Sequence, residues 1–406
     1  MSHRIAILGT GLMGGSLARA LKSNHYPATI SAYARSKRSL ETCRTQGIYD
    51  LLTQQPEDAV KDADMVVLCT PLSSYAALVE AIAPHMKPGA VLTDVGSVKH
   101  APAQEVLHHL TGEQKANFVP GHPIAGTEKS GPEAGFATLY DGKKVVLTPT
   151  AYTSDTALEK VRKLWEAVGA DVVTMESTHH DFTYAMVSHS VQFLSYAFGV
   201  LVQAQPEAVR QTIKEANDRR FQAFIRLTGS DVAMWYDIFR ANRVNVLQAL
   251  AMFEENIRAL ADFIRQGDHT AFQHFIEKAE TKRRMLEPSR QYTATEPVVV
   301  QSGAADILLN QMPYMMASAL MEGLSDAELP FASSGGINGF TENLLTLTLP
   351  FDDMQRSHTI LLVLISDVLT IIHRLQEQVM REPQEMLAEV LKPATEIYRT
   401  LYQKVK

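Results

Sequence analysis

The sequence has little cysteine, since Cys43 and Cys69 are the only two among its 406 residues. Two thiols so far apart exclude the disulfide framework of a small secreted domain, and Cys69 falls in an apolar strand pattern that predicts a buried thiol. A secretory apolar segment is also lacking, because the first residues lead directly into a predicted strand. These absences favour a reducing compartment, and we expect a cytoplasmic protein.

Positive charge is also in short supply, because 45 acidic residues against 38 lysines and arginines leave a net charge of -7. A mildly acidic chain is a poor match for nucleic acid or an anionic membrane surface. No apolar run reaches the ~20 residues that a spanning helix needs. We therefore expect no nucleic-acid partner and no membrane segment. The length suffices for two or three domains.

A glycine-rich motif follows the first predicted strand. The apolar run Arg4–Leu8 leads into Gly9-Thr10-Gly11-Leu12-Met13-Gly14, and a helical pattern continues over residues 16–22. Such glycines permit a tight turn and let the backbone approach a pyrophosphate, which the N-terminus of the next helix stabilises. The motif predicts a dinucleotide site with five cofactor contacts: Gly9, Gly11, Leu12, Met13 and Gly14.

A carboxylate is missing where an NAD site usually carries one. The second predicted strand, Thr29–Tyr33, is followed by Ala34 and the basic run Arg35-Ser36-Lys37-Arg38. An acid here would accept a hydrogen bond from the ribose of NAD, whereas arginine suits the 2′-phosphate of NADP. We expect Arg35 and Ser36 to bind the cofactor and NADP to be favoured over NAD. The alternative is a solvated basic helix start.

Further alternating units predict an α/β, doubly wound Rossmann-type sheet over residues 1–176. Asp64–Cys69 is a strand pattern that ends at Thr70 and Pro71, and Val91–Asp94 is another. Residues at the carboxyl ends of such strands line the cofactor crevice, so Thr70 and Pro71 are expected cofactor contacts. Two later patterns, Lys144–Thr148 and Asp171–Met175, are predicted to close the domain.

From His179 onward the strand patterns stop. One helical pattern opens at His180-Asp181, and another opens at Ser230-Asp231, where either residue can cap a helix. Helices are expected to continue to about Leu286. We predict a helical domain over residues 177–290, a connector over 291–302 and a second helical domain over 303–406.

The second helical block resembles the first. Residues 309–314 correspond to 188–193, residues 339–342 to 223–226, and residues 351–356 to 235–240, with spacings that agree to a few residues. This pattern predicts a diverged duplication, the alternative being coincidence between two amphipathic segments. Asn310 stands against His189 and Glu342 against Arg226, so the second copy is expected to be structural.

The segment Gly121–Gly131 crowds His122, Glu128 and Lys129 into a few residues. Glycine and proline interrupt any helical or strand period, which predicts a rigid loop that directs side chains at a ligand. With the cofactor motif upstream, this loop indicates hydride chemistry assisted by an imidazole.

In this order the motifs resemble those of the prephenate/arogenate dehydrogenase family of tyrosine biosynthesis. The resemblance spans roughly residues 4–286. It is carried by the glycine motif, Asp94–Lys99, Gly121–Gly131, His180-Asp181, Ser188-His189, Phe224–Arg226, Ser230-Asp231 and Met234-Trp235. It implies an oxidoreductase that oxidatively decarboxylates prephenate to 4-hydroxyphenylpyruvate, or arogenate to tyrosine, with NAD(P).

The resemblance implies roles for two residues at the reacting carbon. A group must take or share the substrate's hydroxyl proton while hydride leaves, and histidine suits that task near neutral pH. His122 is the candidate catalytic residue, and Ser97 is its hydrogen-bond partner or a second contact to the hydroxyl. A purely structural loop histidine is the alternative for His122.

The substrate that the resemblance implies is a dianion and needs a fixed cation, and Arg226 is the candidate because a guanidinium can bind a carboxylate with two hydrogen bonds. By resemblance, Thr127 and Glu128 bind the substrate, with Glu128 at the pocket mouth, while His180 and Trp235 shape the substrate side. The alternatives are core positions for His180 and Trp235 and an interhelical ion pair for Arg226.

Departures from the family pattern leave the substrate open. Gln192 stands where the family often has a second histidine, and Ala223 replaces an aspartate common just before Phe-x-Arg. Prephenate, arogenate and an amino-substituted analogue therefore all remain candidates. The histidines lack the spacing and acidic neighbours of a metal site, so no metal is expected.

In the family, two chains interlock through their helical domains. A second copy in this chain suggests that residues 303–406 pack on 178–290 as a partner would, giving an intrachain pseudo-dimer that is a monomer or a homodimer. Two rival enzymes are a 3-hydroxyacid-type dehydrogenase, which the His122 loop disfavours, and a bifunctional enzyme with a C-terminal helical mutase. The mutase is disfavoured because residues 303–350 contain no lysine or arginine. A non-catalytic cofactor sensor is a further alternative.

Overall fold

The computed structural model describes residues 3–127, 129–215, 225–286, 312–325, 328, 358–381 and 384–401. Internal contacts divide the chain into two units, Met1–Asp181 and Phe182–Lys406. The division falls shortly after residue 176, and the expected four-part organisation stays a prediction.

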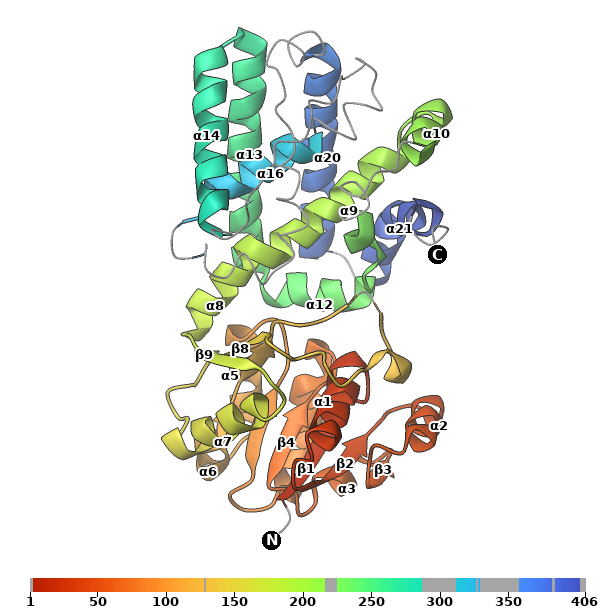
Figure 1. Ribbon diagram of the computed structural model, residues 1–406, viewed down its shortest axis with the longest axis vertical. Helices are drawn as coiled ribbons and strands as arrows, with labels where there is room; N and C mark the ends of the chain where they lie inside the picture. The colour runs from red at the N-terminus through yellow and green to blue at the C-terminus, as the bar shows by residue number, and fades with distance from the viewer. Residues whose placement is uncertain are drawn as a thin grey trace. The chain divides into compact units, whose positions relative to one another are not determined.

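Six parallel strands form the main sheet of the first unit, in the order β3-β2-β1-β4-β5-β6 (Figure 1). This order is that of a doubly wound dinucleotide-binding sheet, so the predicted Rossmann-type fold is confirmed. The strands are β1 (His3–Leu8), β2 (Ala28–Tyr33), β3 (Leu51–Thr53), β4 (Met65–Leu68), β5 (Val91–Asp94) and β6 (Phe118–Val119). The helices of this unit are α1 (Leu12–Ser23), α2 (Lys37–Gln46), α3 (Pro56–Val60), α4 (Tyr75–Ile82), α5 (His100–His108), α6 (Gly112–Ala116) and α7 (Asp155–Glu166).

A separate three-stranded sheet corrects two expectations. β7 (Gly121–Pro123), β8 (Lys144–Leu147) and β9 (Asp171–Thr174) pair in the order β7-β8-β9, so the two closing strands do not join the main sheet. Residues 121–123, expected as loop, are a strand antiparallel to β8, with His122 opposite Val146. A three-residue strand shows too little alternation to be recognised in a sequence.

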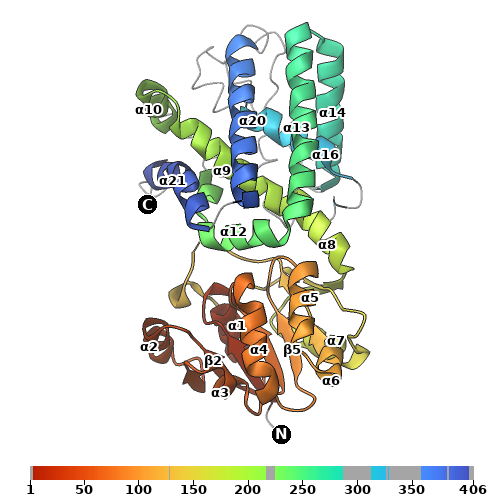
Figure 2. The same cartoon turned by 180° about the vertical axis from the view of Figure 1, so that it is seen from behind.

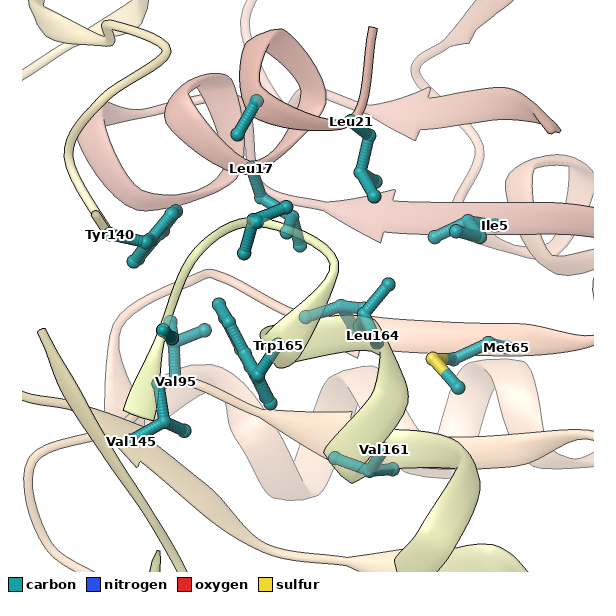
Figure 3. Close-up of a cluster of buried hydrophobic side chains, with 14 of the residues drawn as sticks. Ile5, Leu17, Leu21, Met65, Val95, Tyr140, Val145, Val161, Leu164 and Trp165 are labelled. Carbon is teal, nitrogen blue, oxygen red and sulfur yellow. The ribbon is translucent and has the colours of Figure 1, made fainter. Parts of the chain in front are cut away.

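The core of the first unit forms where α1 and α7 meet the strands. Figure 3 shows Leu17 and Leu21 from α1 in one cluster with Leu164 and Trp165 from α7. Trp165 is fully buried and meets Tyr140 edge to face, with ring centroids 5.1 Å apart. This core fixes α1, whose N-terminus carries the glycine motif, against β1 and β4.

The second unit is helical over its described residues (Figure 2). Its central helix α9 contacts α13, α20, α21 and the short turn η5. Helix α8 (Ser177–Tyr184) crosses the division, so His180 and Asp181 belong to the first unit. The elements that follow are the π turn η4 (Ala185–His189), α9 (Ser190–Gln203), α10 (Glu207–Glu215), η5 (Leu227–Gly229), α12 (Val232–Ala241), α13 (Arg243–Gln266), α14 (His269–Leu286), α16 (Met312–Gly323), α20 (His358–Arg381) and α21 (Gln384–Leu401).

The helical pattern expected from Ser230-Asp231 is present but broken in two. The Asp231 side chain caps α12 by accepting hydrogen bonds from the Ala233 and Met234 backbone N–H groups at 2.8 and 3.1 Å. α12 then ends at Ala241 and α13 starts at Arg243, whereas the apolar spacing predicted one helix. The break lies at Asn242, which is buried and donates to His189.

The C-terminal helices pack on the preceding ones. α16 contacts α13 and α14, α20 contacts α13 and α9, and α21 contacts α9, α12 and η5. The connector 291–302 and the repeat landmarks at 309–311, 339–342 and 351–356 lie outside the described residues. The duplication therefore stays a prediction.

The expectation that no segment is apolar enough to span a membrane is wrong on length and composition. Two helical segments pass that test, Ser177–Gln203 and His358–Met380. The most apolar window of the first is 89% buried inside the protein, as befits a core helix, and that of the second is 39% buried. Sequence alone does not separate a buried core helix from a spanning one.

Candidate active site

The glycine motif has the geometry that a dinucleotide requires. Gly9 has φ +114°, and a Cβ there would lie 2.5 Å from the Cys69 carbonyl oxygen. A Cβ on Gly14 would lie 2.0 Å from the Gly9 oxygen, whereas a Cβ on Gly11 would meet nothing within 4 Å. The first and third glycines thus allow tight packing, and the second faces open space at the N-terminus of α1, where a pyrophosphate fits.

The end of β2 presents a basic, exposed surface. Ala34 is buried, while Arg35 and Ser36 are exposed, and the Ser36 hydroxyl caps α2 by accepting from Ser39 N at 3.0 Å. Thr70 and Pro71 come shortly after β4, which pairs with β1 on the side opposite β2, and their contact with the cofactor stays a prediction. Cys69, expected to be buried, is only half-buried, although burial still raises the pKa of its thiol.

A chain of hydrogen bonds backs His122. His122 lies on β7 and is 8% exposed, and its Nδ1 lies 2.9 Å from Nε2 of His180. His180 is fully buried, and its Nδ1 lies 2.8 Å from Oδ1 of Asp181. Asp181 in turn accepts from the backbone N–H groups of Lys99 and His100, at 2.8 and 2.9 Å. His180 thus joins His122 to Asp181, rather than standing alone on the substrate side.

The hydrogen-bond chain dictates which ring nitrogens carry protons. Burial lowers the pKa of His180, although the bond to Asp181 opposes this, so the ring is neutral at pH near 7. Burial would raise the pKa of Asp181, but the bonds from His180 and the backbone N–H groups outweigh it and lower that pKa. The carboxylate can only accept, so His180 donates from Nδ1 and accepts at Nε2. His122 must then donate from Nδ1, so in the neutral ring the lone pair is on Nε2.

A buried ion pair ties β7 to the end of β5. Lys99 is 1% exposed, and its Nζ donates to Asp94 Oδ2 and, at 2.6 Å, to the Gly121 carbonyl oxygen. Asp94 Oδ1 accepts from Gly121 N at 3.0 Å, and Oδ2 accepts from Gly96 N at 2.8 Å. Both backbone groups of Gly121 are therefore held, which fixes the residue directly before His122.

The other residues expected in the first unit have simpler surroundings. Ser97 is half-buried in the loop between β5 and α5. Thr127 is exposed, and its Oγ1 accepts from Lys129 N at 3.2 Å. Glu128 lies outside the described residues. The roles assigned to these three residues stay predictions.

His189 and Trp235 lie in one aromatic cluster of the second unit, with ring centroids 6.1 Å apart. Asn242 Nδ2 lies 3.1 Å from His189 Nδ1, at the end of the π turn η4, a rare conformation that often marks functional sites. Trp235 packs on Phe239 with centroids 5.7 Å apart. Its buried indole Nε1 has no hydrogen-bond partner among the described residues, which leaves a donor for a ligand.

Arg226 is half-buried and directly precedes η5. α9 holds this turn through two side chains: Gln192 Nε2 donates to the Leu227 carbonyl at 2.8 Å, and the Tyr196 hydroxyl donates to the Ser230 carbonyl at 3.2 Å. Gln192, which replaces the second histidine of the family pattern, thus supports the turn next to Arg226. The carboxylate clamp by Arg226 stays a prediction.

Sequence reasoning missed the function of Asp181, Asp94 and Lys99. All three stood in the quoted motifs, and the adjacent pair His180-Asp181 was the available signal for a hydrogen-bonded dyad. The partner of His180 was not recognisable, because His122 is brought to it by the fold. No group of three or more potential metal ligands occurs among the described residues.

Two family models match most of the first unit and the first part of the second. The family model of the prephenate dehydrogenase nucleotide-binding domain matches residues 17–174, and that of the prephenate dehydrogenase dimerization domain matches residues 176–278. Helices α16, α20 and α21 lie beyond both matches.

The relatives agree with these domain matches. Cyclohexadienyl dehydrogenase of Zymomonas mobilis is 32% identical over 280 residues, 68% of this chain and 94% of the relative. Prephenate dehydrogenase of Bacillus subtilis is 28% identical over 294 residues, 72% of this chain and 78% of the relative. The structure of A. aeolicus prephenate dehydrogenase with hydroxyphenyl propionate and NAD+ matches with a TM-score of 0.65 at 31% identity, over 71% of this chain and 99% of that one. The resemblance seen in the sequence is confirmed, and the chain belongs to the prephenate/arogenate dehydrogenase family.

Proposed function

We propose that this chain is an enzyme of tyrosine biosynthesis that oxidatively decarboxylates prephenate with a nicotinamide cofactor. The observation that carries the proposal is the hydrogen-bond chain from His122 through His180 to Asp181. It fixes the tautomer in which Nδ1 of His122 carries the proton and Nε2 is the basic nitrogen, on a strand anchored to the carboxyl end of β5. That end of a doubly wound sheet is where dinucleotides bind.

The proton movements follow from this geometry. When bound, the nicotinamide accepts the hydride from the substrate carbon that carries the hydroxyl group. His122 Nε2 takes the hydroxyl proton as that carbon is oxidised, and the buried Asp181 carboxylate stabilises the resulting charge through His180. The bond to the ring carboxylate breaks, CO2 leaves, and the electron pair completes the aromatic ring. The ring oxygen then takes its proton back from His122, so the base is regenerated.

Binding is assigned to the residues that the family pattern singles out. Arg226 binds a substrate carboxylate, because a guanidinium matches it with two parallel charge-assisted bonds. Trp235 offers an indole N–H, and Thr127 and Glu128 complete the substrate contacts. Ser97 bonds to His122 or to the substrate hydroxyl. We assign no metal to the reaction, and we expect the enzyme in the cytoplasm.

NADP is proposed as the preferred cofactor, with NAD as the alternative. Residues 34–38 contain no acid, and exposed Arg35 and Ser36 suit a 2′-phosphate. The A. aeolicus prephenate dehydrogenase structure contains NAD+, which supports NAD as the alternative. Arogenate is the alternative substrate, since the departure at Gln192 falls beside the Arg226 turn.

The test is direct. Purified full-length protein is mixed with prephenate or arogenate and with NADP+ or NAD+, and the absorbance of the reduced nicotinamide is followed. We expect turnover of prephenate with a higher kcat/KM for NADP+. His122→Ala should lose about 10²–10⁴-fold in kcat. Exposed His108→Ala is the matched control and should retain the parent value. Failure of both substrates to reduce either cofactor would refute the proposal, as would full activity of His122→Ala.

We also propose that the chain is an intrachain pseudo-dimer. Two relatives that match over almost their whole length, 94% and 99%, cover only 68% and 71% of this chain. Helices α16, α20 and α21 lie beyond the residues that the two family models match, and we call them the C-terminal extension. These helices contact α9, α13 and α14, which lie largely within the match to the dimerization domain. The C-terminal extension thus packs, within the same chain, on part of the region that matches the prephenate dehydrogenase dimerization domain.

A further inference from the structure

The last helix of the chain packs against the turn that follows Arg226. α21 contacts α9, α12 and η5, and Figures 1 and 2 both show it beside α9. Its buried residues recur at three- and four-residue intervals, which places them on one helix face. They are Leu391, Ala394, Ile397 and Tyr398. This face belongs to the extension beyond the family matches.

At Gly199, α21 packs closely against α9. A Cβ on this residue of α9 would lie 2.8 Å from Ala394 Cβ and 3.2 Å from Thr228 Cγ2 in η5. Glycine disfavours the helical state, so a glycine inside α9 needs a reason. The reason is space, because α9, η5 and α21 meet at this point.

At Gly229, α21 packs closely against η5. A Cβ there would lie 2.5 Å from Cζ and 2.6 Å from Cε1 of Tyr398, so the ring lies directly on the glycine. Gly229 is not among the glycines with positive φ, so its backbone conformation is open to any residue. The Tyr398 ring is what requires glycine at this position.

We propose that Tyr398 is a positioning residue for substrate binding. Its ring holds η5 in place and thereby fixes the guanidinium of Arg226, three residues before Gly229 in the chain. α9 holds the same turn through Gln192 and Tyr196, so the turn is secured by two helices, one of them from the extension. The inference rests on the proposed function, because it concerns the substrate contact of Arg226.

The experiment compares variants of the full-length enzyme by steady-state kinetics, below the melting temperature of each. Tyr398→Ala removes the ring and should raise the KM for prephenate about tenfold or more, with the KM for the cofactor changed less than about twofold. Tyr398→Phe keeps the ring and should restore the parent value. Glu396→Ala, at an exposed position of α21, is the matched control and should match the parent.

A double-mutant cycle tests the contact itself. Gly229→Ala should raise the KM for prephenate in the parent, because its Cβ displaces the ring, and should have little further effect in Tyr398→Ala. Equal effects in both backgrounds would overturn the proposal, and so would a lower melting temperature with an unchanged KM. Should Tyr398→Ala fail to fold, Tyr398→Leu takes its place with the same expectations.

Arg226→Gln separates this inference from the proposed function. If it leaves the KM for prephenate unchanged, the assigned role of Arg226 is wrong. If Arg226→Gln raises that KM and the Tyr398 variants do not, only the positioning role fails. Hydrogen exchange at the Leu227–Ser230 amides provides a readout without turnover, and Tyr398→Ala should speed it at least several-fold.

Discussion

At the scale of single residues, the Asp181 carboxylate serves two structures at once. One oxygen orients His180, and the two oxygens together accept from the backbone N–H groups at the start of α5. An acid at a helix N-terminus stabilises the helix, and an acid beside a histidine fixes its tautomer. The proposed proton transfer and the local stability of α5 therefore both depend on this one side chain.

Asp181→Asn should keep the shape of the side chain while removing its negative charge. The amide can donate to His180 Nδ1, which would reverse the proton order along the chain and remove the lone pair from His122 Nε2. We expect kcat to fall by about 10²-fold or more, with a near-constant KM for the cofactor, measured by steady-state kinetics. His179→Asn changes an exposed neighbour and should behave as the parent. Normal turnover of Asp181→Asn would contradict the hydrogen-bond chain.

The buried, neutral state of His180 predicts a pH dependence of stability. Its folded pKa lies below the ordinary value of 6.5, so between the two values only the unfolded state binds the proton. Stability should fall as pH drops below 6.5, by up to about 1.4 kcal/mol per pH unit from this group. His180→Gln should show a shallower loss of unfolding free energy from about pH 7 to about pH 5 in urea titrations. Parallel pH profiles of parent and variant would refute the assignment.

At the scale of elements, the Lys99–Asp94 pair fastens the strand that bears His122 to the main sheet. Burial lowers the pKa of Lys99, while Asp94 and Asp181 oppose the shift. The attraction between two buried charges is largely offset by the free energy of removing both from water. We therefore expect the main effect of this pair to be that it holds β7 in position.

Lys99→Met should therefore be costly, because it leaves Asp94 buried without its cation. We expect a loss of about 3–5 kcal/mol in the free energy of unfolding, measured by urea denaturation. Lys87→Met removes a lysine from a solvent-accessible pair with Asp64 and should cost less than about 1 kcal/mol. Similar losses in the two variants would mean that burial of the Lys99 pair is unimportant.

The N-terminus of α1 offers a cofactor test that leaves the protein core untouched. Gly11→Ala adds a Cβ that meets no protein atom within 4 Å, so thermal stability should stay near that of the parent. The same Cβ occupies the space proposed for the pyrophosphate, and the KM for the cofactor should rise about tenfold or more. Gly112→Ala, also in open space, is the control and should change neither quantity. An unchanged cofactor KM in Gly11→Ala would place the pyrophosphate elsewhere.

At the scale of the whole molecule, the pseudo-dimer proposal predicts the mass in solution. If the extension replaces a partner, sedimentation equilibrium should give the mass of one chain at micromolar concentrations. A mass of two chains would argue that the extension leaves the family interface open, while the contacts of α20 and α21 with α9 would stand.

The sequence anticipated the first unit better than the second. Strands β1, β2, β4 and β5 were predictable, because buried parallel strands and glycine turns have strong local patterns. β7 and the break at Asn242 were not, since both depend on contacts with distant residues. The pairing of His122 with His180 was equally invisible, because it joins residues 58 positions apart.

The two glycines that face α21 lie in the part of the chain that the family model matches, and the residues they contact lie outside it. Gly199 and Gly229 lie within the region shared with relatives, whereas Ala394 and Tyr398 do not. A larger residue at either glycine would collide with α21, so we expect these positions and the facing residues of α21 to vary together. Among uncharacterised members of the family, a small residue at both positions should accompany an added C-terminal helix, and bulkier residues should accompany chains that end earlier.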